Sequence, residues 1–390
     1  MKITAVLERT LPISRYADPA IPPGGLDTSA VAVVTDLVRG GEPVVGYGFA
    51  SIGRFAQGGL IHDRFAPRLL AAADLSDPDT GSLDPDRAWA AMMAGEKPGG
   101  HGERSVAVGT LDMALWDAAA KAAGLPLWRY IARRLGRDET RAADPVPVYA
   151  GGGYYYPSDD RGRLRDEMAQ FRDAGYTRAK IKVGAAGLAE DLARIEIAAQ
   201  ALGGAGNLAV DAVYSYGPEA ALAAAEAFQP YGLWWFEDIC DPLDFTLLAH
   251  VAAAYGPPIA AGEGNFGAAD ARNLLRHGGL RADLDVLLFD IAHCYGLPEY
   301  IRMIELAEDM GWDRRSFWPH GGHLFTLHAV AALGLGGAEV NPHNFQPFGG
   351  LSDTAAVADG HARPPDLPGI GFEGRAALAD LFGDLLRRGA

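Results

Sequence analysis

The sequence predicts an α/β protein built on a barrel of parallel strands. From residue 145 onward, short apolar runs alternate with helical stretches rich in Ala, Leu, Glu and Arg, in units of about 25–32 residues. Three of these runs end in a carboxylate, and the three residues, Asp211, Glu237 and Glu263, follow one another at intervals of 26. Eight such units would close into a (β/α)₈ barrel, whose strands all end at one rim.

Seven apolar runs are expected to form barrel strands, and an eighth run is weaker. In chain order the seven are 147–150, 178–183, 208–212, 233–238, 258–263, 286–291 and 316–320, and the eighth lies near 339–345. Short apolar runs between turn-forming residues are typical of buried parallel strands. Helices are expected between them, for example over 187–202 and 217–229.

The first 144 residues and the tail follow a different pattern. Two Val-rich runs, 28–36 and 43–49, flank an Arg-Gly-Gly-Glu turn, which predicts a β-hairpin. Residues 103–135 carry an apolar stripe at helical spacing, and Gly124 ends its first segment. A further helix is expected at about 375–388 in the tail.

Composition narrows the class of protein. The 390 residues are 49% hydrophobic, which is enough for a large core, and the net charge is −16. That charge disfavours nucleic acid or an anionic membrane as a partner. No apolar run is long enough for a membrane span, and the N-terminus lacks a signal-peptide pattern. With only two cysteines, Cys240 and Cys294, we expect a cytoplasmic protein with reduced thiols.

The three strand-end carboxylates predict a metal site. Asp211, Glu237 and Glu263 would offer three oxygen ligands side by side on one rim of the barrel. Oxygen ligands suit a hard divalent cation, so we expect Mg²⁺ as the cofactor.

Lysines and a histidine at other strand ends complete a catalytic constellation. Lys180 and Lys182 lie two residues apart, so both should face the barrel interior. Their mutual repulsion should lower the pKa of at least one of them toward the range of a general base. Asp290 and His320 end neighbouring strands, so Asp290 should hydrogen-bond the imidazole and fix its tautomer.

This order of residues suits removal of a proton next to a carboxylate. A substrate on the metal would have Lys182 on one face and His320 on the other. A dehydratase and a racemase or epimerase both fit, because they share the enediolate intermediate. Each residue alone has a structural interpretation, such as a helix cap or a solvated strand face. A non-catalytic barrel stabilised by metal needs neither the lysine pair nor the dyad.

These residues resemble the enolase superfamily, in particular its mandelate racemase-like branch. The matching residues are Lys180-Ile181-Lys182, Asp211, Glu237, Glu263, Asp290 and His320. The segment 114–127 also resembles a helix of the family's N-terminal domain. The resemblance implies a modified (β/α)₇β barrel over 145–363. It also implies an α+β capping domain over 1–144, completed by about 364–390.

The resemblance also implies a function and roles. The chain would be a Mg²⁺-dependent dehydratase that converts a small anionic hydroxy-carboxylate or acid sugar to a 2-keto acid. Lys182 would abstract the α-proton, and protonated His320 would assist loss of the β-hydroxyl. Lys180 would tune Lys182, and Asp290 would orient His320. We also expect a homo-oligomer.

Longer strings resemble one group of the family, the D-tartrate dehydratases. They span residues 89–93, 96–104, 151–157, 319–323, 345–350 and 365–374. By this similarity Lys97, Tyr155 and His323 would contact the substrate, with Lys97 suited to a second carboxylate.

Departures from the tartrate pattern lie close to the expected metal. Val213 stands two residues after the first ligand, where acid-sugar dehydratases commonly have Asn, and Gly264 replaces the Asn that follows the third ligand. The loop 14–26 is rich in Pro and Gly and poor in polar anchors. The catalytic set is retained while polar contacts are lost, so we expect D-tartrate to be a poor substrate.

Overall fold

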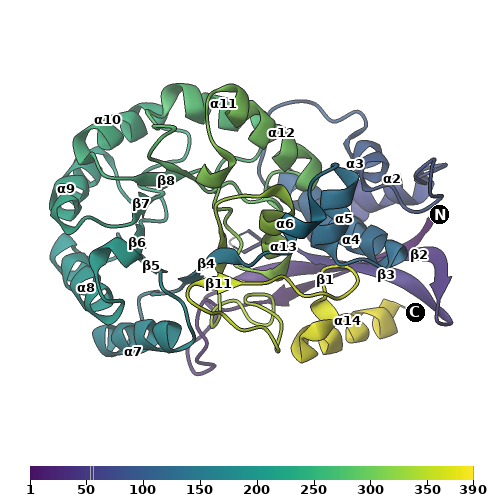
Figure 1. Ribbon diagram of the computed structural model, residues 1–390, viewed down its shortest axis with the longest axis horizontal. Coiled ribbons are helices and arrows are strands. Elements are labelled where there is room, and N and C mark those ends of the chain that lie inside the picture. Colours follow the sequence, from purple (N-terminus) through teal and green to yellow (C-terminus); the bar gives the residue numbers. More distant parts are fainter. Residues whose placement is uncertain (53, 56, 390) are drawn as a thin grey trace.

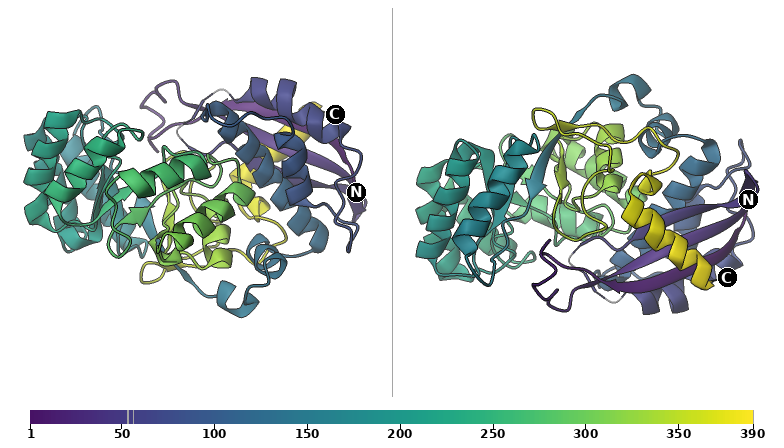
Figure 2. Two further views of the ribbon diagram at one scale, coloured as in Figure 1. Left: turned by 90° about the horizontal axis from the view of Figure 1, so that it is seen from above. Right: turned by 90° about the horizontal axis from the view of Figure 1, so that it is seen from below.

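The computed structural model describes residues 1–52, 54–55 and 57–389. A ring of helices around parallel strands forms one part of the molecule. An antiparallel sheet covered by helices forms the other, and both chain ends lie there (Figure 1). The tail returns from the barrel to lie against the N-terminal sheet in both further views (Figure 2). The predicted fold, a TIM-type barrel with a capping domain, is confirmed; the boundaries at 145 and 364 stay predictions.

The barrel sheet is parallel and runs in the order β10-β4-β5-β6-β7-β8-β9. Its strands are β4 (Val146–Gly151), β5 (Ala179–Lys182), β6 (Leu208–Asp211), β7 (Trp235–Glu237), β8 (Ile259–Ala261), β9 (Val286–Leu287) and β10 (Ala338–Val340). A short strand, β11 (His361–Ala362), pairs antiparallel with β4. The register places Lys182 beside Asp211 and Asp211 beside Glu237, so these side chains end neighbouring strands at one level.

The prediction of a strand over 316–320 is wrong. A short 3₁₀ turn occupies Arg314–Ser316, and Phe317 makes only an isolated parallel bridge to Leu287. Pro319 interrupts the ladder because it has no N–H group to donate. Two backbone hydrogen bonds, from Trp318 N to Leu287 O (2.9 Å) and from His320 N to Leu288 O (3.2 Å), still hold the segment in the seventh position.

Helices cover the outside of the barrel between the strands. They are α7 (Asp160–Asp173), α8 (Leu188–Ala201), α9 (Pro218–Phe228), α10 (Phe245–Tyr255), α11 (Ala268–His277), α12 (Leu297–Asp309) and α13 (Leu324–Leu333), with 3₁₀ turns at Ala205–Asn207 and Gln229–Tyr231. The helices expected over 187–202 and 217–229 are α8 and α9. In α9, Pro218 begins the helix, where a missing N–H costs nothing, and Ala221, Ala225 and Phe228 form its buried face.

The capping domain begins with an antiparallel sheet in the order β1-β2-β3. Its strands are β1 (Ile3–Pro12), β2 (Asp27–Arg39) and β3 (Glu42–Phe49). The predicted hairpin is the β2–β3 connection, where Gly40 and Gly41 both adopt positive φ.

A long buried helix, α4 (Glu103–Ala123), lies on this sheet. Glycines permit the close approach: a Cβ on Gly46 would lie 1.9 Å from the carbonyl oxygen of Ala114, and one on Gly48 would lie 2.5 Å from that of Thr110. As predicted, α4 ends at Gly124, in the left-handed conformation, and α5 (Leu127–Arg134) follows.

The tail helix α14 (Ala376–Gly389) packs against the same sheet, where the rings of Phe382 and Tyr47 stack 4.4 Å apart. The remaining short elements are α1 (Gly58–Leu60), a π-helical turn (Ile61–Phe65), α2 (Ala66–Ala71), α3 (Pro85–Met93), α6 (Glu139–Ala142) and a 3₁₀ turn (Phe372–Gly374). Among the described residues, no helix has the length and apolar character needed to cross a membrane.

Candidate active site

A cavity of 490 Å³ lies at the ends of the barrel strands. Lys182, Glu263 and His320 line it together with residues from the loop 14–26 of the capping domain. Two larger hollows, of 1120 and 1010 Å³, lie elsewhere on the described surface and contain none of these groups. We therefore place the candidate active site in the smaller cavity, because the titratable groups converge there.

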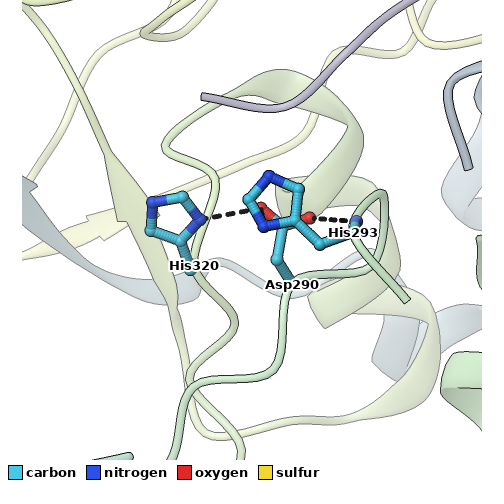
Figure 3. Close-up of side chains that lie close together, drawn as sticks. All are labelled: Asp290, His293 and His320. Carbon is cyan, nitrogen blue, oxygen red and sulfur yellow. Dashed lines mark hydrogen bonds and ion pairs between the residues drawn. The ribbon is translucent and has the colours of Figure 1, made fainter. Parts of the chain in front are cut away.

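The predicted His–Asp pair forms behind one wall of this cavity. His320 Nδ1 donates a hydrogen bond of 2.7 Å to Asp290 Oδ2 (Figure 3). Asp290 is 1% exposed, and the Ser51 hydroxyl donates to the same oxygen at 2.5 Å. Because Nδ1 carries the donated proton, the other ring nitrogen, Nε2, is the one left for a substrate.

Neighbouring ionisable groups control the charge of both members of this pair. Burial alone would lower the pKa of His320, but Glu263, 3.7 Å from Nε2, and the hydrogen bond to Asp290 raise it to about 9. Burial alone would raise the pKa of Asp290, but His293 and His320 hold it below its ordinary value. His320 is therefore protonated at neutral pH in this structure.

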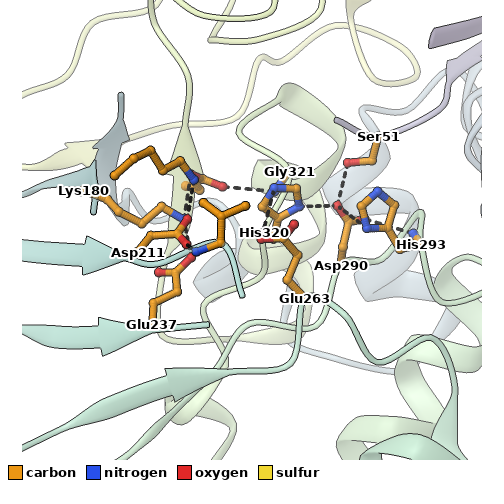
Figure 4. A network of polar contacts seen from close by, with 12 residues as sticks. Ser51, Lys180, Asp211, Glu237, Glu263, Asp290, His293, His320 and Gly321 are labelled. Carbon is orange, nitrogen blue, oxygen red and sulfur yellow. Dashed lines mark hydrogen bonds and ion pairs between the residues drawn. The ribbon is translucent and has the colours of Figure 1, made fainter. Parts of the chain in front are cut away.

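On the opposite side of the site, Lys180 lies among the strand-end carboxylates (Figure 4). Lys180 Nζ lies 2.5 Å from Glu237 Oε1, 3.6 Å from Asp211 and 3.2 Å from Glu339. Lys182 Nζ forms an ion pair with Asp211 Oδ2. The shared inward face that the Lys-x-Lys spacing predicts is thus present.

The pKa expectation for the lysines is wrong for this arrangement. Burial lowers the pKa of Lys182, but Asp211 and Tyr154 outweigh it, and the net shift is upward. The pKa of Lys180 is likewise raised, because Glu237 and Glu339 outweigh its burial. The repulsion between the two ammonium groups is smaller than their attraction to these carboxylates.

The carboxylates fit a hard divalent cation. Oxygens of Asp211, Glu237 and Asp238 lie within 4.8 Å of one another, all three residues are buried, and each can offer an oxygen ligand. Two lysine ammonium groups form ion pairs with Glu237 and Asp211 of this cluster. Glu263, the expected third ligand, follows the next strand, and its carboxylate faces His320. The donor set is all oxygen, as Mg²⁺ requires.

The three residues that we expected to contact substrate occupy different surroundings. Tyr155 lines the cavity, and its hydroxyl donates to Asp191. His323 is buried behind the cavity, with Nε2 3.3 Å from the Ser51 hydroxyl, and burial lowers its pKa to about 4. Lys97 lies on the exposed loop after α3, outside the residues that line the cavity, and its backbone oxygen accepts from Arg104.

Sequence reasoning missed several residues of the site. Glu339 in β10 is buried between Lys180 and the Gly321 N–H, which donates to it at 3.2 Å. Its position in a strand of the rim could have identified it, but the eighth strand carried a weak signal. The ring of Tyr154 lies 5.2 Å from Lys182 Nζ, and Ser51 arrives from the capping domain. No local pattern marks these last two residues.

Comparisons with known proteins agree with this geometry. Residues 163–378 match the family described as Enolase C-terminal domain-like. A 3,6-anhydro-alpha-L-galactonate cycloisomerase from Streptomyces coelicolor is 31% identical over 73% of this chain and 72% of its own length. An L-talarate/galactarate dehydratase from Salmonella typhimurium is 29% identical over 88% of this chain and 80% of its own.

A solved structure extends the likeness to nearly the whole chain. A racemase from Streptomyces coelicolor A3(2), with bound magnesium, superposes with a TM-score of 0.76 at 26% identity and covers 98% of this chain and 99% of its own. The match includes both the barrel and the capping domain. This chain is therefore an enzyme of the enolase superfamily and belongs with its mandelate racemase-like members.

Proposed function

We propose that this enzyme is a Mg²⁺-dependent dehydratase of a small hydroxy-carboxylate or acid sugar. The observation that carries the proposal is the placement of Lys182 and His320 in one cavity, beside a cluster of strand-end carboxylates. The family membership, the dehydratase relative and the magnesium-bound structure support it. We assign Asp211, Glu237 and Glu263 as ligands. Mg²⁺, when bound, would stabilise negative charge on the substrate carboxylate.

Lys182 is the proposed base, and its environment sets a condition on that role. A base must be neutral, but the ion pair with Asp211 now holds its proton. Lys182 can accept a substrate proton only when the charge of Asp211 is engaged by another cation. Lys180, whose ammonium group is shared by Glu237 and Glu339, stays charged beside it. The repulsion between the charged Lys180 and a charged Lys182 then favours the neutral form of Lys182.

His320 is the proposed acid. It is protonated at neutral pH, and Asp290 pins Nδ1. The Nε2–H is therefore the proton available to a leaving hydroxyl group, which departs as water. The remaining enol tautomerises to a 2-keto acid.

A screen of acid sugars and hydroxy-diacids with Mg²⁺ tests the assignment. Each reaction is followed for 2-keto acid by a carbonyl reagent and for loss of optical rotation. Formation of a keto acid supports the dehydratase. Loss of rotation without a keto acid would identify the alternative, a racemase or epimerase that uses Lys182 and His320 as opposed bases.

We further propose tartrate-dehydratase-like chemistry on a substrate less polar than D-tartrate. The outer cavity is walled mainly by aromatic and aliphatic side chains, which are Tyr16, Leu26, Ile52, Phe55, Val213 and Phe345. Arg15, in the loop 14–26, contributes a positive charge to the lining of this cavity. A buried polar group without a partner costs about 1–3 kcal/mol, so these walls suit few hydroxyl groups.

The kcat/KM for D-tartrate decides this finer proposal. One or two unpaired polar groups would lower it by roughly ten- to ten-thousand-fold. A value of about 10⁴ M⁻¹s⁻¹ or more would show that other contacts replace the lost ones.

A further inference from the structure

His293 is a buried histidine that the proposed reaction does not use. It is 0% exposed, and neither ring nitrogen has a hydrogen-bond partner among the described residues. A buried imidazole normally donates from one nitrogen and accepts at the other, so two unpartnered nitrogens are costly. The ring lies beside that of His320, with centroids 5.5 Å apart (Figure 3).

The donor atoms of His293, Asp290 and His320 converge on one point. All lie within 4.8 Å of one another. Asp290 Oδ2 is 2.7 Å from His320 Nδ1 and 3.7 Å from His293 Nδ1. Tetrahedral zinc with bonds of about 2.0 Å needs ligand atoms about 3.3 Å apart, and the two measured distances bracket that value.

Asp290 is held so that Oδ2 faces the histidines. Its other oxygen, Oδ1, accepts from the backbone N–H groups of Ala292 at 2.7 Å and His293 at 3.1 Å. His320 lines the cavity, so an ion can approach from the side that solvent reaches.

We propose that Asp290, His293 and His320 form a second metal site, which takes Zn²⁺. Two imidazole nitrogens and one carboxylate oxygen are zinc ligands, whereas the carboxylate cluster at Asp211 and Glu237 offers only oxygen and suits Mg²⁺. The ion replaces the proton on His320 Nδ1, which leaves to solvent, and water fills the fourth position. The two sites therefore select different cations.

Occupation of this site would switch off the Lys182–His320 chemistry. The hydrogen bond from His320 Nδ1 to Asp290 would be replaced by two bonds to the metal. The metal-bound imidazole would keep its Nε2 proton but would no longer be an imidazolium, so it would be a much weaker acid toward the leaving hydroxyl group. Zn²⁺ should therefore inhibit turnover at saturating Mg²⁺, whatever the substrate is.

Cobalt absorption tests the site without an activity assay. Co²⁺ substitutes for Zn²⁺, and a tetrahedral N/O site gives a strong visible band, while an octahedral oxygen site gives a weak one. We expect the purified protein in excess Mg²⁺ to show a saturable strong band that added Zn²⁺ abolishes. Glu237→Gln, which alters the carboxylate cluster, should keep the band. The absence of a saturable band in the wild type would overturn the proposal.

The variants assign the ligands. His293→Leu should bind Co²⁺ at least about tenfold more weakly and lose the strong band. His277→Asn, at the exposed end of α11, is the matched control and should bind as the wild type does. If circular dichroism shows that His293→Leu is unfolded, His293→Gln replaces it, since Gln can hydrogen-bond but is a poor zinc ligand. Wild-type Co²⁺ affinity in the folded variant would also overturn the proposal, as would an affinity of the control reduced equally.

Discussion

At the residue scale, the protonation states of the site depend on which charged groups are neighbours. Lys182 and His320 both carry a proton in this structure, and in each case a carboxylate holds it there. Asp211 does so for the lysine and Glu263, with Asp290, for the histidine. The two groups differ in their proposed roles: Lys182 must lose its proton before it can act as the base, whereas His320 must keep its proton until it acts as the acid.

Deuterium exchange should separate the two roles. In D₂O, His320→Asn should still exchange the substrate α-proton without losing water, because Lys182 is intact. Lys182→Ala should lose both exchange and dehydration, because Lys180, the other amine near Asp211, stays charged between Glu237 and Glu339. NMR of the recovered substrate measures exchange. Continued exchange in Lys182→Ala would reverse our assignment and make His320 the abstracting base.

Glu237→Gln should weaken Mg²⁺ binding and abolish turnover while the fold is retained. The change keeps the size of the side chain but removes one negative charge from the cluster, so Mg²⁺ affinity should fall at least about tenfold. Isothermal titration calorimetry measures it. Glu226→Gln, on the exposed face of α9, is the control and should leave Mg²⁺ affinity unchanged.

Excess chelator should inactivate the wild type reversibly. Full activity in EDTA would reject the metal requirement.

At the element scale, the capping domain depends on how closely α4 approaches the sheet. Gly46 and Gly48 in β3 leave room for the backbone of the helix, which is buried along most of its length. On its other side α4 contacts the barrel, where a Cβ on Gly109 would lie 1.9 Å from the carbonyl oxygen of Ala292. The helix therefore connects the sheet to the loop that carries Asp290.

Gly46→Ala should destabilise the protein by about 1–3 kcal/mol or more, because the new methyl group overlaps backbone atoms that cannot rotate away. Urea denaturation measures the loss. Gly59→Ala is the matched control: it lies in α1 with nothing within 4 Å of the added Cβ, and its effect should stay within about 1 kcal/mol. Equal effects of the two changes would show that α4 can move away from the sheet.

At the scale of the whole molecule, a buried histidine joins barrel, capping domain and tail. His328 in α13 accepts from the N–H of Trp128 in α5 at 3.0 Å, and its Nε2 donates to Ile370 O in the tail at 3.0 Å. The ring is therefore neutral and uses both nitrogens. Burial lowers its pKa to about 3.

This histidine should make stability fall with acid. Between pH 6.5 and 3, His328 binds a proton in the unfolded chain but not in the folded protein. Its contribution to the free energy of unfolding is therefore present above pH 6.5 and lost as the pH falls. From pH 7 to 5 the loss from this group is about 2 kcal/mol. Urea unfolding of the wild type and His328→Gln at both pH values isolates it, because other groups titrate in both proteins. Parallel losses in the two proteins would contradict the assignment.

The barrel, the order of its strands and the main catalytic candidates could be predicted from the sequence. Strand-ending residues such as Asp211 and Glu237 can be identified because each follows its own apolar run. Parallel strands bring these ends to one rim of the barrel. The strand predicted over 316–320 does not form, because Pro319 has no N–H group for the ladder, but His320 still reaches Asp290.

The protonation states of the site and the residues around it depend on contacts that exist only in the folded chain. Ser51 reaches Asp290 across 239 residues of chain, and His293 faces His320 because two loops meet. The pKa values of the two lysines rise because Asp211, Glu237 and Glu339 lie close to them. Their attraction exceeds the repulsion between the two ammonium groups. Local pattern encodes which residues end a strand, but contact distance sets electrostatic energy, and distance between strands is fixed only when the barrel closes.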